Sequence, residues 1–147
     1  MPFKENARKF IGEILIEEGY LEQGTLEEAL KIQKEKGGLI GEILVRMGVI
    51  SEEQLVVALS KQLSIPFIRL PHYNVNREAL GFIPRETAER HLLFPFERDE
   101  EELSVALGEP LNPEIFSQLE EKISLRVQRF LAPLSDIRQA IEVYYKG

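Results

Sequence analysis

The chain has 147 residues, 44% of them apolar, no cysteine and a formal net charge of −7. This length and apolar content suit one domain or two small subdomains, and the lack of cysteine excludes disulfides and thiolate metal sites and fits a reducing cytoplasm. Acidic residues outnumber basic ones in both halves, 11 against 8 up to Leu63 and 14 against 10 beyond it, so a surface for long DNA or RNA is not expected. No apolar signal core and no run of about 18 apolar residues occurs, so neither export nor membrane insertion is expected.

An internal repeat joins residues 10–33 to residues 39–62 at a constant offset of 29. Ten of the 24 aligned positions are identical, without a gap. A repeat this close indicates one supersecondary unit that is present twice. The identical pairs are Ile11/Ile40, Gly12/Gly41, Glu13/Glu42, Ile14/Ile43, Leu15/Leu44, Gly19/Gly48, Leu26/Leu55, Ala29/Ala58, Leu30/Leu59 and Gln33/Gln62.

Two short helices are predicted in each repeat, because apolar residues recur at helical spacing on both sides of a central glycine. That glycine, Gly19 or Gly48, lies where a left-handed C-cap is expected. Ser51 and Gln54 are predicted to form a capping box for the last helix, whereas Glu22 offers the first repeat a weaker cap. Neither two-helix unit can bury its apolar face alone, so the pair is predicted to form a four-helix bundle with approximate twofold symmetry.

The second half of the chain has a different pattern, in which short apolar runs alternate with helical segments. Together the two halves predict an α+β fold, with a helical tandem-repeat subdomain over residues 1–64 and a small mixed α/β subdomain over residues 65–147. The elements expected in the second half are a strand at 67–70, a helix at 84–91, a hairpin of 92–98 with 103–107, a helix at 113–122, a strand at 125–131, and a last helix that Ser135 caps and that carries an apolar stripe of Ile137, Ile141 and Tyr144.

The sequence lacks the elements of the common catalytic classes. No segment matches GxxxxGK[ST], the loop that cradles nucleotide phosphates, and the glycine-rich segment 37–41 has neither the lysine nor a preceding strand. His72 and His91 lie in unlike contexts, so a zinc site is not expected. The carboxylates lie mostly on helices, where solvated faces explain them. We therefore expect no catalytic residue and no metal site.

The repeated pattern x-Ile-Gly-Glu-Ile-Leu-(Ile/Val)-x-x-Gly-x-(Leu/Ile)-x4-Leu-x2-Ala-Leu-x2-Gln, with the five-residue spacer 34–38, resembles the tandem motif of the N-terminal domain of type II secretion and type IV pilus assembly ATPases. The second half extends the resemblance over almost the whole chain, through Ile65-Pro66-Phe67, Ile83-Pro84, Glu109-Pro110 and the closing helix. The resemblance implies a cytoplasmic, non-catalytic module that couples the hexameric motor ATPase domain to inner-membrane platform proteins. Some members of the family also bind cyclic di-GMP, so the resemblance makes this cyclic dinucleotide a possible ligand.

Carried over to this chain, the resemblance marks a set of candidate ligand residues in the two repeats. Ligand-binding members carry arginine before the Leu-Gly or Ile-Gly step, where a guanidinium can contact a guanine edge, but here those positions are Phe10 and Leu39. The candidate residues are Phe10, Ile11, Gly12, Leu15, Gly19 and Gln33 in the first repeat, and Leu39, Ile40, Gly41, Leu44, Gly48 and Gln62 in the second.

Simpler explanations exist for each kind of candidate residue. Gly12 and Gly41 can mark places where a helix lies too close to its neighbour for a Cβ. Gln33 and Gln62 can serve as hydrogen-bond partners between helices. Three functions therefore stay open: a docking and regulatory module of a motor, a cyclic di-GMP receptor of the same fold, and a domain that stands alone or is attached to a partner other than the motor.

Overall fold

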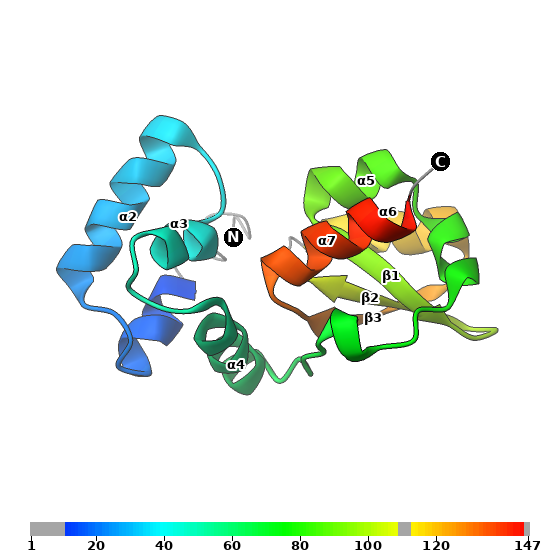
Figure 1. Cartoon of the computed structure of the whole chain (residues 1–147), viewed down its shortest axis with the longest axis horizontal. Coiled ribbons are helices and arrows are strands. Elements are labelled where there is room, and N and C mark those ends of the chain that lie inside the picture. The colour runs from blue at the N-terminus through cyan, green and yellow to red at the C-terminus, as the bar shows by residue number, and fades with distance from the viewer. Residues whose placement is uncertain (1–10, 109–112, 146–147) are drawn as a thin grey trace. The chain divides into compact units, whose positions relative to one another are not determined.

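A computed structural model describes residues 11–108 and 113–145 of the chain. Contacts between residues divide the chain into two compact units, with the boundary between Ser64 and Ile65. The first unit is helical and contains no strand in its described part (Figure 1). The second contains a three-stranded sheet with helices packed against it. The predicted α+β fold class is confirmed.

The helical unit contains two helices from each repeat. Residues 11–17 and α2 (Gln23–Lys36) come from the first repeat, and α3 (Ile40–Arg46) and α4 (Glu52–Leu63) come from the second. Apolar residues at helical spacing turn inward, as the repeat predicts. The buried residues include Ile11, Ile14, Leu15, Leu26 and Ala29 together with Ile40, Ile43, Leu44, Leu55, Ala58 and Leu59.

The helix ends of this unit follow the local chemistry of the sequence. Ser51 Oγ accepts from the Gln54 backbone N–H at 3.1 Å, and Gln54 Oε1 accepts from the Ser51 backbone N–H at 3.0 Å. The predicted capping box is thus confirmed at the start of α4. Glu22 occupies the N-cap of α2 without a side-chain hydrogen bond, in keeping with the weaker cap expected there.

The second unit is built on a sheet with the order β1-β2-β3. Strands β1 (Leu93–Arg98) and β2 (Glu102–Leu107) form the predicted antiparallel hairpin, with a bulge between Pro95 and Glu97. Strand β3 (Arg126–Leu131) pairs with β2 in parallel, and α6 (Pro113–Ile123) provides the crossover that a parallel pair needs.

Two further helices and two 3-10 turns complete this unit. Helix α5 (Arg85–His91) begins after Pro84, and α7 (Leu134–Tyr144) is the last element of the described chain; both pack on β1. The 3-10 turns are η1 (Leu70–His72) and η2 (Arg77–Phe82). The core includes the fully buried side chains Ile83, Leu93, Phe94, Leu103, Val105, Leu107, Leu131 and Ile137.

Two details of the sequence prediction are wrong. The strand expected at 67–70 is reduced to a single parallel bridge between Phe67 and Leu131, and η1 begins at Leu70. Proline at position 71 lacks an amide donor and favours the 3-10 turn over a longer strand. Ser135 does not cap the last helix, because α7 already begins at Leu134 with Pro133 as its N-cap.

Candidate functional site

The two repeats end their first helices with the same backbone turn. Gly19 has φ +83° and Gly48 has φ +76°, the left-handed conformation that favours glycine. The Gly19 N–H donates to Ile16 O at 3.1 Å and the Tyr20 N–H donates to Leu15 O at 3.0 Å, the pair of bonds of a Schellman motif. The second repeat has the same bonds, from Gly48 N–H to Val45 O at 3.0 Å and from Val49 N–H to Leu44 O at 3.2 Å.

Most apolar residues of the candidate ligand set belong to the core. Leu15 and Leu44 have no exposed surface, and Ile11 and Ile40 are 3% and 1% exposed. Side chains buried to this degree stabilise the helical unit by removing apolar surface from water. Phe10 lies outside the described residues.

Gly12, one of two buried glycines in the candidate set, lies where a helix approaches its neighbour closely. A Cβ added to Gly12 would lie 2.6 Å from Leu26 Cδ2 and 2.7 Å from Leu26 Cδ1, inside van der Waals contact. The close approach of residues 11–17 to α2 therefore explains glycine at position 12. Gly41 is also buried, within α3.

Gln33 and Gln62, equivalent in the two repeats, have different partners. Gln33 is buried, and its Nε2 donates to Gly38 O at 2.9 Å, which closes the five-residue spacer onto the end of α2. Gln62 is exposed, and its Nε2 donates to Glu18 Oε2 at 2.7 Å. Each amide donor thus already has an acceptor within the protein.

Glu18 is a residue that the repeat comparison passes over, because Met47 stands at the equivalent position. Besides Gln62, its carboxylate contacts Lys61 Nζ at 3.3 Å. The Glu18 side chain is 19% exposed and that of Lys61 is 67% exposed. This contact places a negative charge beside one candidate glutamine of the tandem motif. Its only signal in the sequence is a charged residue at a position that is uncharged in the other repeat.

The arginine position of the second repeat is visible in the structure. Leu39 is half-buried and is the N-cap of α3, with extended backbone. An arginine there would begin at the start of the helix, beside Gly41 and the spacer. Gln33, through its bond to Gly38 O, and Leu39 therefore both lie at the α2–α3 connection, whereas Gly19 and Gly48 lie at the ends of the first helix of each repeat.

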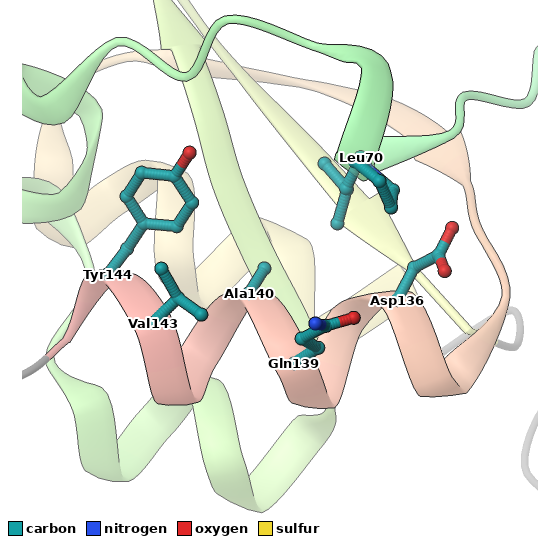
Figure 2. Close-up of a pocket in the computed structure, with 7 residues that line it drawn as sticks. Leu70, Asp136, Gln139, Ala140, Val143 and Tyr144 are labelled. Atoms are coloured by element: carbon teal, nitrogen blue, oxygen red, sulfur yellow. The ribbon is translucent and has the colours of Figure 1, made fainter.

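A small cavity of about 180 Å³ lies between η1 and α7 in the second unit. Figure 2 shows Leu70 on one side and the α7 side chains on the other, from Asp136 to Tyr144. Asp136 is buried and accepts from Arg69 Nε at 2.9 Å. Its position in the first turn of α7 also favours a negative charge. This ion pair is accounted for by the docking of η1 on α7.

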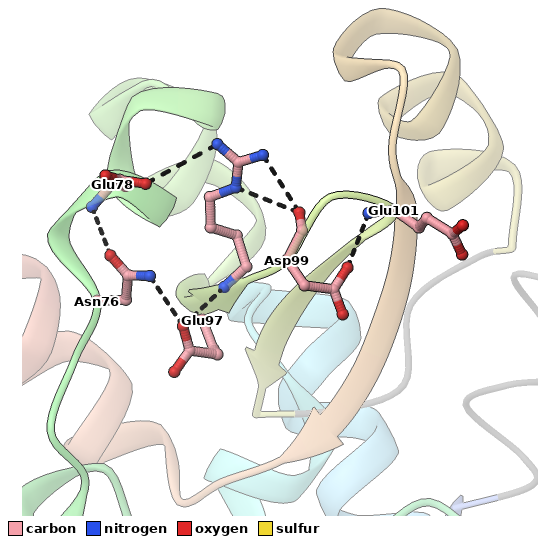
Figure 3. Close-up of polar contacts among 6 residues, drawn as sticks. Asn76, Glu78, Glu97, Asp99 and Glu101 are labelled. Atoms are coloured by element: carbon pink, nitrogen blue, oxygen red, sulfur yellow. Dashed lines mark hydrogen bonds and ion pairs between the residues drawn. The ribbon is translucent and has the colours of Figure 1, made fainter.

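A polar cluster joins the β1–β2 hairpin to the segment before η2 (Figure 3). Glu97 accepts from Asn76 Nδ2 at 2.9 Å and from Tyr73 Oη at 3.1 Å. The hydrogen bond from Asn76, followed by that from the Arg98 backbone N–H, lowers the pKa of the Glu97 carboxyl. At the hairpin tip, two backbone N–H groups at 2.8 Å lower the pKa of Asp99. These bonds stabilise the hairpin and present no free reactive group.

The histidines and carboxylates form no metal centre in the described ranges. Within residues 11–108 and 113–145, no group of three or more His, Asp or Glu side chains is arranged to hold a metal ion. Burial, followed by the nearby Arg90 charge, lowers the pKa of His91. Among the helices that the structure describes, none is long and apolar enough to cross a membrane.

Comparison with known sequences identifies the family. The profile of the MshEN domain matches residues 63–147, more than half of the chain. The chain belongs to the MshEN domain family. The profile covers the sheet-containing unit, whereas the tandem motif lies in the helical unit before it.

Curated relatives of this MshEN chain extend the similarity into the helical unit. It is 34% identical over 135 residues to the type IV pilus assembly ATPase PilB of Myxococcus xanthus, which covers 92% of the chain and 24% of that protein. It is 28% identical over 139 residues to PilB of Thermus thermophilus, covering 93% and 16%. A bacteriophage adsorption protein B of Escherichia coli is 23% identical over 135 residues, covering 92% and 18%. The chain therefore spans at most about a quarter of the length of these relatives.

Solved structures share the fold. A structure of MshE with cyclic di-GMP has a TM-score of 0.75 and 29% identity, and the match covers 92% of this chain and 98% of that one. The N-terminal domain of XpsE has a TM-score of 0.72 at 18% identity, covering 95% and 96%. The resemblance read from the tandem motif is thus confirmed.

Proposed function

We propose that this chain is a non-catalytic docking and regulatory module of a type II secretion or type IV pilus assembly motor. In this proposal it acts in the cytoplasm and links the motor ATPase domain to an inner-membrane platform protein. The similarity to PilB supports it most directly, since it runs over 92% of the chain but only 24% of that ATPase. A segment of this size leaves the catalytic machinery to the remainder of such a protein.

Binding of the full chain to the cytoplasmic part of the platform protein from the same system tests this proposal. Among the described residues, three large apolar side chains are exposed: Val57 at 42%, Phe67 at 48% and Val143 at 50%. Exposed apolar side chains are frequent anchors of protein interfaces. We expect Phe67→Asp or Val143→Asp to weaken binding if the second unit docks, and Val57→Asp if the helical unit docks. Absence of binding by the unmodified chain would contradict the proposal.

A second candidate function is that of a cyclic di-GMP receptor. The structure of MshE with this ligand supports it, because its fold matches 92% of the chain. The tandem motif, with its paired glycines and glutamines, offers a pseudo-symmetric frame for a twofold-symmetric dinucleotide. Against tight binding stand Phe10 and Leu39 at the arginine positions.

Arginine substitution tests whether the frame accepts the ligand. A good bidentate contact to a base contributes about 1–3 kcal/mol, so two such contacts change affinity by about 30-fold to 10⁴-fold. We expect weak or no binding by the unmodified chain in isothermal titration and measurable binding by Phe10→Arg/Leu39→Arg. Gln23→Arg/Val57→Arg adds the same two charges at exposed positions and is the matched control. Tight binding by the unmodified chain that is lost in Gln33→Ala would show that guanine is read without arginine.

A further inference from the structure

The carboxylate of Glu18 sits beside the tandem motif in one repeat only. Glu18 follows the helix of residues 11–17, and the equivalent residue of the second repeat is the uncharged Met47. The side chain is mostly buried, at 19% exposure, and its oxygens accept from Gln62 Nε2 at 2.7 Å and from Lys61 Nζ at 3.3 Å. The two helix ends thereby meet through a charged contact that the internal symmetry does not require.

This contact has two consequences for a phosphate-bearing ligand. The short bond occupies an Nε2 hydrogen of Gln62, so a ligand acceptor would compete with a carboxylate for it. The negative charge also opposes the approach of a dianion over a distance of about 8–10 Å, the Debye length at physiological salt. The Lys61 ammonium offsets the charge only in part, because it is 67% exposed and exposed ion pairs are weak.

We infer that Glu18 is a specificity-determining residue that disfavours phosphate-bearing ligands at the Gln62 side of the tandem motif. The inference rests on the receptor function proposed above as the second candidate. It attributes part of the weak binding of cyclic di-GMP that we expect to Glu18, in addition to Phe10 and Leu39 at the arginine positions. Removal of the Glu18 charge also frees the Lys61 ammonium from its ion pair. The same change therefore removes the repulsion between Glu18 and a ligand phosphate and allows Lys61 to attract that phosphate.

Substitutions that separate charge from hydrogen bonding test this role. In the Phe10→Arg/Leu39→Arg background, Glu18→Gln keeps an acceptor for Gln62 but removes the charge, and Glu18→Ala removes both. We expect cyclic di-GMP to bind about fivefold more tightly to the first variant and about 10- to 50-fold more tightly to the second. Glu17→Gln removes the same charge from the exposed neighbouring position, where water screens it more strongly, and should change the affinity less than Glu18→Gln does.

A ligand without phosphate provides the readout that a structural role would not move. Guanosine should respond less than cyclic di-GMP to Glu18→Gln, since it carries no charge for Glu18 to repel. Equal affinities for cyclic di-GMP in the parent and both Glu18 variants would overturn the inference while leaving the receptor function standing. If neither the parent nor any Glu18 variant binds cyclic di-GMP, both the receptor function and the inference fail.

Discussion

The left-handed turn at Gly19 provides a quantitative test of how the repeat is built. Gly19 has φ +83°, and an added Cβ would meet no atom within 4 Å, so only the backbone conformation opposes a side chain. Gly24, in the first turn of α2, has the same open space without a positive φ. Replacement of glycine by alanine lowers the conformational entropy of the unfolded chain equally at both sites. This effect stabilises the folded state by about 0.4–1 kcal/mol. The difference between the two variants therefore isolates the cost of the left-handed conformation.

That cost is about 1–2 kcal/mol for a residue with a Cβ. We expect Gly24→Ala to raise the free energy of unfolding by up to about 1 kcal/mol and Gly19→Ala to lie about 1–2 kcal/mol below it. The free energy of unfolding of Gly19→Asn should lie between those of the unmodified protein and Gly19→Ala, because asparagine tolerates the left-handed conformation better than alanine does. Urea denaturation followed by circular dichroism measures all three. Equal stabilities for Gly19→Ala and Gly24→Ala would refute the reasoning.

Three further predictions concern the second unit. Hydrogen bonds lower the pKa of Glu97 in the folded state, so the ionised carboxylate stabilises the fold above the usual pKa of about 4.5, and this stabilisation is lost as the pH falls through the lowered pKa. Glu97→Gln should therefore flatten this part of a plot of unfolding free energy against pH. Gly108→Ala should destabilise by about 1–3 kcal/mol in thermal unfolding, because the added Cβ would overlap the Leu134 side chain. A fragment of residues 65–147 should fold alone, with dispersed amide signals in NMR spectra; a collapsed spectrum would contradict two independent subdomains.

Local chemistry predicted the parts of the fold in which a few residues decide the conformation. The glycines at the first helix ends, the Ser51–Gln54 capping box and the β1–β2 hairpin each follow from side chains that satisfy or redirect nearby backbone groups. The parallel partner of β2 comes from farther along the chain, and the sequence predicts a strand there, at 125–131, without indicating its partner. These elements agree between sequence and structure because local and tertiary preferences coincide.

The two wrong predictions fall where the conformation depends on pairing with a distant segment or where two nearby residues could both begin a helix. A strand at 67–70 needs a partner strand of equal length. The segment instead pairs with the single residue Leu131, whose backbone N–H donates to Pro66 O and whose O accepts from the Ile68 N–H. At the last helix, Pro133 and Ser135 both suit a helix start, and the proline, with its preset φ, takes the cap. At the candidate site, the Glu18–Gln62 bond joins residues 44 positions apart, so no local pattern could reveal it.

The identities between the two repeats are largely explained by folding. Buried pairs such as Leu15 and Leu44 fill the core, and Gly19 and Gly48 supply the same left-handed turn. A repeat selected for these roles would look the same whether or not it held a ligand. Only positions that folding leaves free to vary can distinguish a repeat that binds a ligand from one that does not. At such positions the chain has Phe10 and Leu39, where the resemblance leads us to expect arginine in a ligand-binding member, and the carboxylate of Glu18. We expect both differences to reduce the affinity for a dianion, and we therefore propose docking rather than nucleotide sensing as the principal role.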